Sequence, residues 1–156
     1  MYKRILVPVD GSHTATMGLQ EAIRLAIDQR ASLRIIHVVD ELVVAQNLEG
    51  YVNAGELIDA LEASGRKALQ KAVALARKRR VKVEAALFET VGGRVADIVM
   101  REAKKWKADL IVMGTHGRSG LGRLILGSDT EAVLRKTRVP VLMVRAPDRK
   151  KPAARK

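Results

Sequence analysis

The sequence predicts an α/β fold in which an open sheet of five parallel strands has helices on both faces. Short apolar runs, typical of strands, alternate with helical patterns from one end of the chain to the other. Several of these runs are apolar almost throughout, as expected for strands that are covered on both faces. A helical pattern separates successive runs, which is typical of crossover connections between parallel strands. The expected strands are residues 5–9, 32–39, 81–88, 110–113 and 139–144.

The first strand and the first helix are the clearest elements near the N-terminus. Residues 5–9 read Ile-Leu-Val-Pro-Val, and an Asp-Gly-Ser sequence ends the run with a turn. The next segment places apolar residues three and four positions apart, which predicts an amphipathic helix. Its apolar positions are Leu19, Ala22, Ile23 and Ala26. The second strand, 32–39, follows this helix and is rich in Leu, Ile and Val.

The middle of the chain predicts a loop, a long helix and a third strand. Residues 40–53 have weak periodicity, and the segment 41–55 either covers a ligand or forms a mobile loop. The stretch 54–79 repeats apolar residues on one helical face, and 81–88 alternates apolar and polar residues as a strand does. Two consecutive glycines, Gly92 and Gly93, then separate this strand from the next helix.

The last third of the chain predicts two further strands around a glycine-rich segment. A helix through Val95 and Ala103 leads to the strand 110–113. Residues 114–126 are rich in glycine, 128–136 have a helical pattern, and 139–144 form the fifth strand.

Composition predicts a globular protein of one domain. The chain has 156 residues, of which 47% are hydrophobic and 29% charged, and it contains no cysteine. We expect a single domain over residues 1–146 and a basic, disordered tail over 147–156. No apolar run has the length of about 18 residues needed for a membrane span, and no signal-peptide core is present. These features lead us to expect a cytoplasmic protein without a membrane partner.

The net charge of +12 raises the alternative of a nucleic-acid or acidic partner. The tail has five basic residues and one acidic residue, and the rest of the charge is spread over predicted helix ends and exposed faces. Phe88 and Trp106 are not interleaved with the basic runs, as aromatic stacking platforms would be. We therefore favour solubility and a loose tail over nucleic-acid binding.

The segment 114–128 carries the clearest functional signal. It contains five glycines, directly after a predicted buried strand and directly before a helix. Glycine permits positive φ and lets backbone N–H groups approach an anion, and a helix start adds unpaired N–H groups. This pattern predicts a phosphate cradle. The segment lacks the Gly-Lys-Ser/Thr ending of a Walker loop and the third glycine of a dinucleotide fingerprint.

The spacing Gly114, two residues, Gly117, nine residues, Gly127-Ser128 resembles the nucleotide-binding signature of the universal stress protein family, in its ATP-binding branch. Three further blocks support the resemblance along almost the whole chain: the opening 5–12, the run 108–114 and the close 139–144. The end of the second strand, His37-Val38-Val39-Asp40, also matches. The resemblance implies a Rossmann-like sheet with the strand order 3-2-1-4-5.

The resemblance also implies where an adenine nucleotide would lie. Val38 matches a backbone contact to the adenine, and Asp10 matches an acidic position near the ribose and phosphates. Residues 113–117 match the contacts to the ribose and the α-phosphate, and 127–130 match the helix start that binds phosphate. Mg²⁺ commonly accompanies the triphosphate. The expected nucleotide-binding residues are Pro8, Val9, Asp10, Val38, Met113, Gly114, His116, Gly117, Gly127, Ser128, Asp129 and Thr130.

Asp129 departs from the family pattern, because many relatives have an apolar residue there. Its carboxylate would weaken polyphosphate binding, shift the preference toward fewer phosphates, or help to hold Mg²⁺. No metal site made by protein side chains alone is expected, although Asp10 is a candidate contact for a nucleotide-bound Mg²⁺.

Three of the expected site residues, Ser128, Asp10 and His116, also have an interpretation that involves no ligand or no catalysis. Ser128 and Glu131 have the spacing of a capping box, and Asp10 could cap the first helix or its turn. His116 has no serine or carboxylate partner in a recognisable order, so we favour a place over the sugar or in solvent over general-base catalysis.

We therefore expect an ATP-binding stress-response sensor or regulator, at most a slow ATPase and not a dedicated enzyme. One alternative is a metal-dependent nucleotide hydrolase or transferase that uses Asp10. The other is a binder of nucleic acid or of an acidic partner. The family order places strand 139–144 at a sheet edge, and an apolar edge favours a homodimer formed through it.

Overall fold

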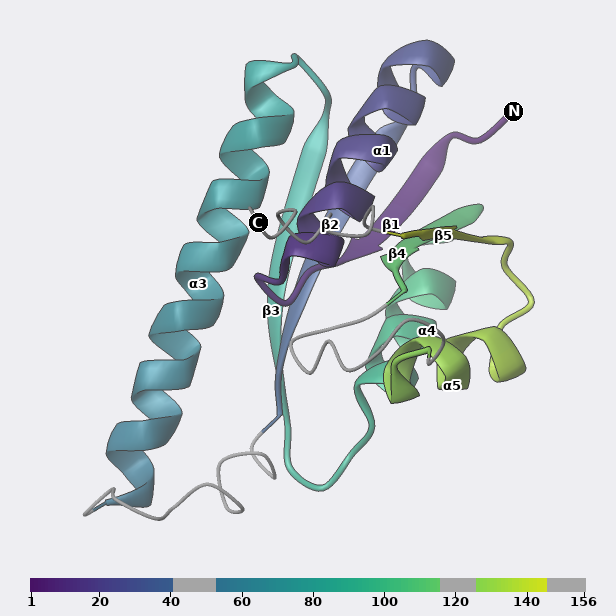
Figure 1. The fold of residues 1–156 in the computed structure, drawn as a ribbon. Helices are drawn as coiled ribbons and strands as arrows, with labels where there is room; N and C mark the ends of the chain where they lie inside the picture. Colours follow the sequence, from purple (N-terminus) through teal and green to yellow (C-terminus); the bar gives the residue numbers. More distant parts are fainter. Residues whose placement is uncertain (41–52, 116–125, 146–156) are drawn as a thin grey trace, which may run out of the picture.

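The computed structural model of the chain describes residues 1–40, 53–115 and 126–145. The expectations for residues 41–52, for most of the glycine-rich segment and for the basic tail lie outside these residues. Within them, five parallel strands form one sheet in the order β3-β2-β1-β4-β5 (Figure 1). This arrangement confirms the predicted fold class. The strands are β1 (Arg4–Pro8), β2 (Ser32–Asp40), β3 (Val83–Thr90), β4 (Leu110–Gly114) and β5 (Val141–Val144).

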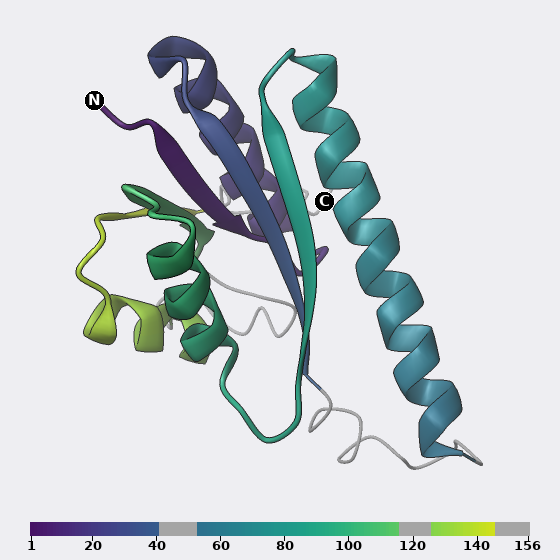
Figure 2. The same ribbon diagram turned by 180° about the vertical axis from the view of Figure 1, so that it is seen from behind.

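The helices lie in two layers, one on each face of the sheet (Figures 1 and 2). One face is covered by α1 (His13–Gln29) and α3 (Ala54–Lys78), and the other by α4 (Val95–Lys105) and α5 (Ser128–Lys136). Successive strand residues supply the two cores because their side chains point to opposite faces. In β1, Ile5 and Val7 pack in the core under α1 and α3, whereas Leu6 packs in the core under α4.

Strands β3 and β5 each begin two residues later than predicted, and local hydrogen bonds explain why. The Val81 N–H bonds the Ala76 carbonyl at the end of α3, so Val81 closes the helix and β3 begins at Val83. The Val139 N–H bonds the Thr137 hydroxyl in a turn, so β5 begins at Val141 and not at 139. Val81 and Val139 are apolar, so the sequence pattern included them in the two strands although they belong to a helix end and a turn.

Strand order places the crevice of the sheet between β1 and β4. The chain runs outward from β1 to β2 and β3, then crosses back to β4 on the other side of β1. In open α/β sheets, ligands bind beyond the carboxyl ends of strands at such a reversal. None of the described helices is long and apolar enough to cross a membrane.

A buried histidine fixes the carboxyl ends of β1 and β2 relative to each other. The His37 Nδ1 lies 2.8 Å from the Val9 carbonyl oxygen, and the Val9 N–H donates to the Ile36 carbonyl at 2.8 Å. Helix α3 passes directly over the imidazole at Gly65, where an added Cβ would lie 2.6 Å from the ring. His37 is therefore a structural residue of the core, held between a strand and a helix.

Candidate functional site

A cavity of about 910 Å³ opens where the carboxyl ends of β1, β2 and β4 meet the starts of α4 and α5. Its size is that of a small-molecule site. Its described lining consists of Pro8, Val9, Asp10, Ala15, Ile36, His37, Val38, Val39, Asp40, Leu61, Gly92, Gly93, Arg94, Val95, Met113, Gly114, Gly127, Ser128, Asp129, Thr130 and Ala132.

Ten of the twelve residues predicted from the sequence line this one cavity. The other two, His116 and Gly117, lie outside the described residues. The topology brings the ten together, because β1, β2 and β4 are neighbours in space although they are far apart in the chain. That these residues contact a nucleotide stays a prediction.

Asp10 is held in a turn at the end of β1. Its Oδ1 accepts a hydrogen bond from the Ser12 backbone N–H at 2.9 Å. Ser12, and not Asp10, caps α1, because its Oγ accepts from the Ala15 N–H at 3.1 Å. The tight turn requires the positive φ of +79° at Gly11. Asp10 thus presents a half-buried carboxylate that the turn orients at the cavity wall.

Gly114 is a glycine because of packing, which corrects the sequence interpretation. A Cβ on this residue would lie 2.8 Å from the Thr14 carbonyl carbon and 3.0 Å from the Ala15 nitrogen in the first turn of α1. Gly127 has φ −60°, so it does not need the left-handed region either. The expectation that the glycines serve positive φ at a phosphate is wrong for these two positions. Gly114 instead keeps the end of β4 close to the first turn of α1.

Helix α5 starts at the cavity without a side-chain cap. The predicted capping box is wrong, because Gly127 is the N-cap residue, Ser128 is already helical and no side chain bonds the N-cap turn. The first helical hydrogen bond runs from the Glu131 N–H to the Gly127 carbonyl. The N–H groups of residues 128–130 precede it. Such groups bind anions at the positive end of a helix.

Two hydrogen bonds tie the start of α5 to the end of β4. The Thr130 hydroxyl donates to the Gly114 carbonyl at 3.2 Å, and the Gly127 N–H donates to the Thr115 carbonyl at 3.0 Å. Thr130 is buried and therefore has a structural role in addition to any ligand contact. The helix start is consequently fixed in relation to the strand that carries Met113.

Asp129 caps the neighbouring helix. Its carboxylate accepts a hydrogen bond from the Ala96 backbone N–H in the first turn of α4. Arg94, the N-cap residue of α4, makes no side-chain cap of its own. Burial raises the pKa of Asp129, and repulsion from the carboxylates of Asp40 and Asp10 raises it further, while the Ala96 bond and Arg94 act in the opposite direction. The carboxylates of Asp40 and Asp10 therefore both act on Asp129 across the cavity.

Sequence reasoning missed Asp40 and the loop between β3 and α4. Asp40 ends β2, and Gly92, Gly93 and Arg94 form the wall contributed by that loop. The rule that ligands bind at strand ends could have found Asp40. Nothing in the sequence indicated that the loop would reach the cavity, because this depends on how α4 packs.

A second cavity, of about 1040 Å³, lies between α1 and α3. It shares Val9, Asp10 and Ala15 with the first cavity and is bordered by Lys67 and Lys71. Although it is slightly larger, it contains none of the described residues of the β4–α5 signature, so we assign the candidate site to the first cavity. In the described part of the chain, no group of three or more His, Cys, Asp or Glu side chains is arranged to hold a metal ion.

Comparisons with known proteins agree on one family. The model of the universal stress protein family matches residues 1–145. A universal stress protein of Methanocaldococcus jannaschii is 38% identical over 94% of this chain and 84% of its own length. The solved structure of a second protein of that organism is also similar, with 27% identity and a TM-score of 0.80. The match covers 96% of this chain and 99% of the chain in that structure.

A universal stress protein of Archaeoglobus fulgidus, solved in complex with dAMP, has the same fold. It is 24% identical, with a TM-score of 0.64, and the match covers 92% of this chain and 98% of its own. From its family model, its relatives and its fold, this chain belongs to the universal stress protein family.

Proposed function

We propose that this chain binds an adenine nucleotide, ATP together with Mg²⁺, in the cavity at the strand ends and acts as a stress-response sensor. One observation carries the proposal: ten residues of the nucleotide signature, from three strands and a helix start, line a single cavity. The dAMP complex of the Archaeoglobus fulgidus relative belongs to that protein. At 24% identity it supports the fold of this chain and not the details of its site.

The geometry suggests how the nucleotide would lie. The adenine would lie against Val38 at the end of β2, with the ribose between Asp10 and Met113, all of which line the cavity. The phosphates would then reach the N–H groups at the start of α5, which carries the positive end of a helix dipole. The base would thus be held at the end of strand β2 and the phosphates at the start of helix α5.

The donor set fits a magnesium ion that arrives with the nucleotide. Mg²⁺ is usually held by one or two carboxylates together with the phosphates of the substrate. Asp10 offers a carboxylate at the cavity wall, which suits this mode of binding. When bound, the ion would neutralise phosphate charge, and Asp10 would orient it.

We propose a sensor and not a dedicated ATPase, with at most slow hydrolysis. Fast phosphoryl transfer requires a residue that positions the attacking water and cations that stabilise the transition state. The described lining supplies one arginine, Arg94, and it lies at the α4 start, where its charge acts on the Asp129 carboxylate. Turnover at excess ATP and Mg²⁺ distinguishes this proposal from the alternative of a metal-dependent hydrolase. Multiple turnovers per second would contradict it.

Calorimetric titration with ATP and Mg²⁺ tests the binding itself. We expect saturable binding in the wild type and its loss in Gly127→Val, because a branched side chain would occupy the space of the phosphates. Gly55→Val is the matched control: Gly55 is exposed on α3 and does not line the cavity. Absence of binding by the wild type at millimolar nucleotide would refute the proposal, and wild-type affinity in Gly127→Val would place the phosphates elsewhere.

We further propose a homodimer formed through β5. In the described residues β5 pairs with β4 on one side only, and it ends the sheet. Met143 is 38% exposed, whereas Leu142 and Val144 pack against the core under α1. An apolar edge strand of this kind is commonly covered by a second copy.

Light scattering tests the dimer with Met143→Lys, which changes an exposed position and leaves the core contacts of β5 in place. We expect twice the chain mass of 17.1 kDa for the wild type at micromolar concentration. The variant should shift toward the monomer. A monomeric wild type would contradict the proposed dimer.

A further inference from the structure

Three carboxylates face the candidate nucleotide cavity from three different elements. Asp10 follows β1, Asp40 ends β2, and Asp129 lies in the first turn of α5. Arg94 is the one lysine or arginine in the described lining. The described wall is therefore net negative. That is an unusual environment for a ligand whose phosphates are themselves anionic, since like charges in a partly enclosed site repel strongly.

The start of α5 contains both an attraction and a repulsion for phosphate. The N–H groups of residues 128–130 precede the first helical hydrogen bond and attract an anion. The Asp129 carboxylate lies in the same turn and repels one. The Ala96 backbone N–H of α4 stabilises the charged form of this carboxylate, so the negative charge lies between α4 and α5.

Asp40 and Asp10 line the same cavity as Asp129 and are close enough to act on its charge. Repulsion from Asp40 and from Asp10 acts on Asp129 in addition to its burial, and Arg94 compensates only in part. Every further negative charge that enters the cavity adds to this repulsion. A ligand with one phosphate adds less than a ligand with three, and a divalent cation removes part of the penalty for either.

From this arrangement we propose that Asp129 makes the nucleotide site selective for low phosphate charge, so that without divalent cations it binds AMP more tightly than ATP. Divalent cations restore ATP binding by neutralising the added charge. The inference rests on the proposed function, because it assigns the preference of that same site.

The test compares wild type and Asp129→Asn with AMP and ATP, each measured by calorimetry in EDTA and in excess Mg²⁺. Asparagine keeps the shape and the oxygen that accepts the Ala96 N–H, and removes only the charge. In EDTA we expect ATP to tighten about tenfold, the size expected for one charge pair in a partly solvated site, and AMP to tighten by a smaller factor. In Mg²⁺ the gain for ATP should shrink.

Asp97→Asn is the matched control. Asp97 lies in the first turn of α4, pairs with Lys136 and is outside the cavity lining. Asp97→Asn therefore changes the net charge of the protein by the same amount as Asp129→Asn, but outside the cavity. It should leave the ratio of ATP to AMP affinity unchanged. Asp40→Asn is a second variant within the cavity and should change the ratio in the same direction as Asp129→Asn.

The outcomes separate the inference from the proposed function. An equal effect of Asp129→Asn on AMP and ATP, or an equal effect of the Asp97 control, would overturn the charge selectivity while binding remains. A wild-type protein that binds neither nucleotide in either buffer would overturn the proposed function itself. A selective gain for ATP in EDTA, seen in both cavity variants, would support the inference.

Discussion

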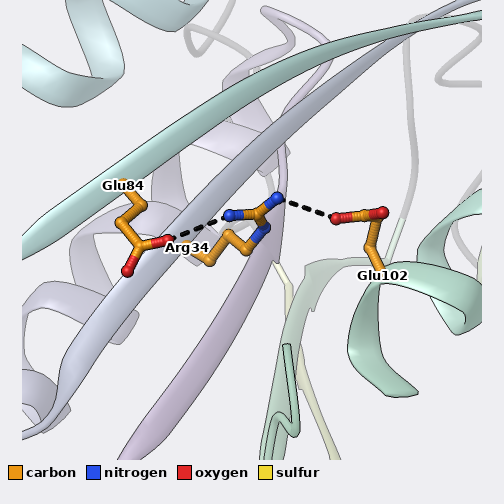
Figure 3. A network of polar contacts seen from close by, with 3 residues as sticks. All are labelled: Arg34, Glu84 and Glu102. Atoms are coloured by element: carbon orange, nitrogen blue, oxygen red, sulfur yellow. Dashed lines mark hydrogen bonds and ion pairs between the residues drawn. The ribbon is translucent and has the colours of Figure 1, made fainter. Parts of the chain in front are cut away.

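Charged side chains are arranged differently at the two ends of the sheet. Toward the amino ends of the strands, Arg34 on β2 bonds Glu84 on β3 at 3.0 Å and Glu102 on α4 at 2.9 Å (Figure 3). At the carboxyl ends, three carboxylates share one cavity whose described lining contains a single arginine. The first end uses charge to attach a helix to the sheet, whereas the described lining of the second carries more acidic than basic side chains.

Further contacts at the amino end have the same structural character. The Asp109 carboxylate accepts hydrogen bonds from the backbone N–H groups of Lys3 and Arg4, which joins the start of β1 to the start of β4. The Arg4 guanidinium lies 4.7 Å from the centre of the Trp106 ring. These charges are thus paired locally at the amino end of the sheet.

The largest effect is expected from breaking the amino-end network. Arg34→Met leaves the Glu102 carboxylate, which is 1% exposed, buried without its partner. We expect a loss of about 3–5 kcal/mol in the free energy of unfolding, measured by urea denaturation. Glu84→Gln is the control and should cost under about 1 kcal/mol, because the Glu84 side chain is 49% exposed and is left in water without its charge. Equal losses in the two variants would show that burial of Glu102 is not what matters.

A smaller effect is expected at the carboxyl end, where Gly114 meets α1. Gly114→Ala forces a Cβ against the Thr14 backbone, and we expect a loss of about 1–3 kcal/mol in unfolding free energy. Gly127→Ala should cost less, because φ at Gly127 is −60° and alanine adopts that value without strain. Denaturation curves of the two variants give the comparison. A costlier Gly127→Ala would mean that the helix start is packed more tightly than the strand end.

The smallest effect concerns pH and Asp129. Because its pKa is raised in the folded protein, ionisation costs stability, and the cost disappears as pH falls through the folded pKa toward the unfolded value of about 3.9. Asp129→Asn should therefore stabilise the protein at pH 7, by less than about 1 kcal/mol for a half-buried group. The gain should vanish below about pH 4. A gain that persists in acid would exclude the carboxylate charge as its cause.

The fold could be predicted because it depends on local patterns: apolar runs and crossover helices indicate a parallel sheet. The residues that line the cavity were expected because the chain resembles the universal stress protein family at those positions. The role of Gly114 could not be predicted, because it depends on the approach of α1 from another part of the chain. The same holds for Asp129, whose hydrogen-bond partner Ala96 belongs to a different helix.

The turn after β1 has a consequence for the whole carboxyl end. Val9, Asp10 and Ala15 line both cavities, so the two cavities share a wall at this turn. The positive φ of Gly11 and the bond from the Ser12 N–H to Asp10 give the turn its shape. A substitution at Asp10 therefore changes the lining of the space between α1 and α3 as well as that of the cavity at the strand ends.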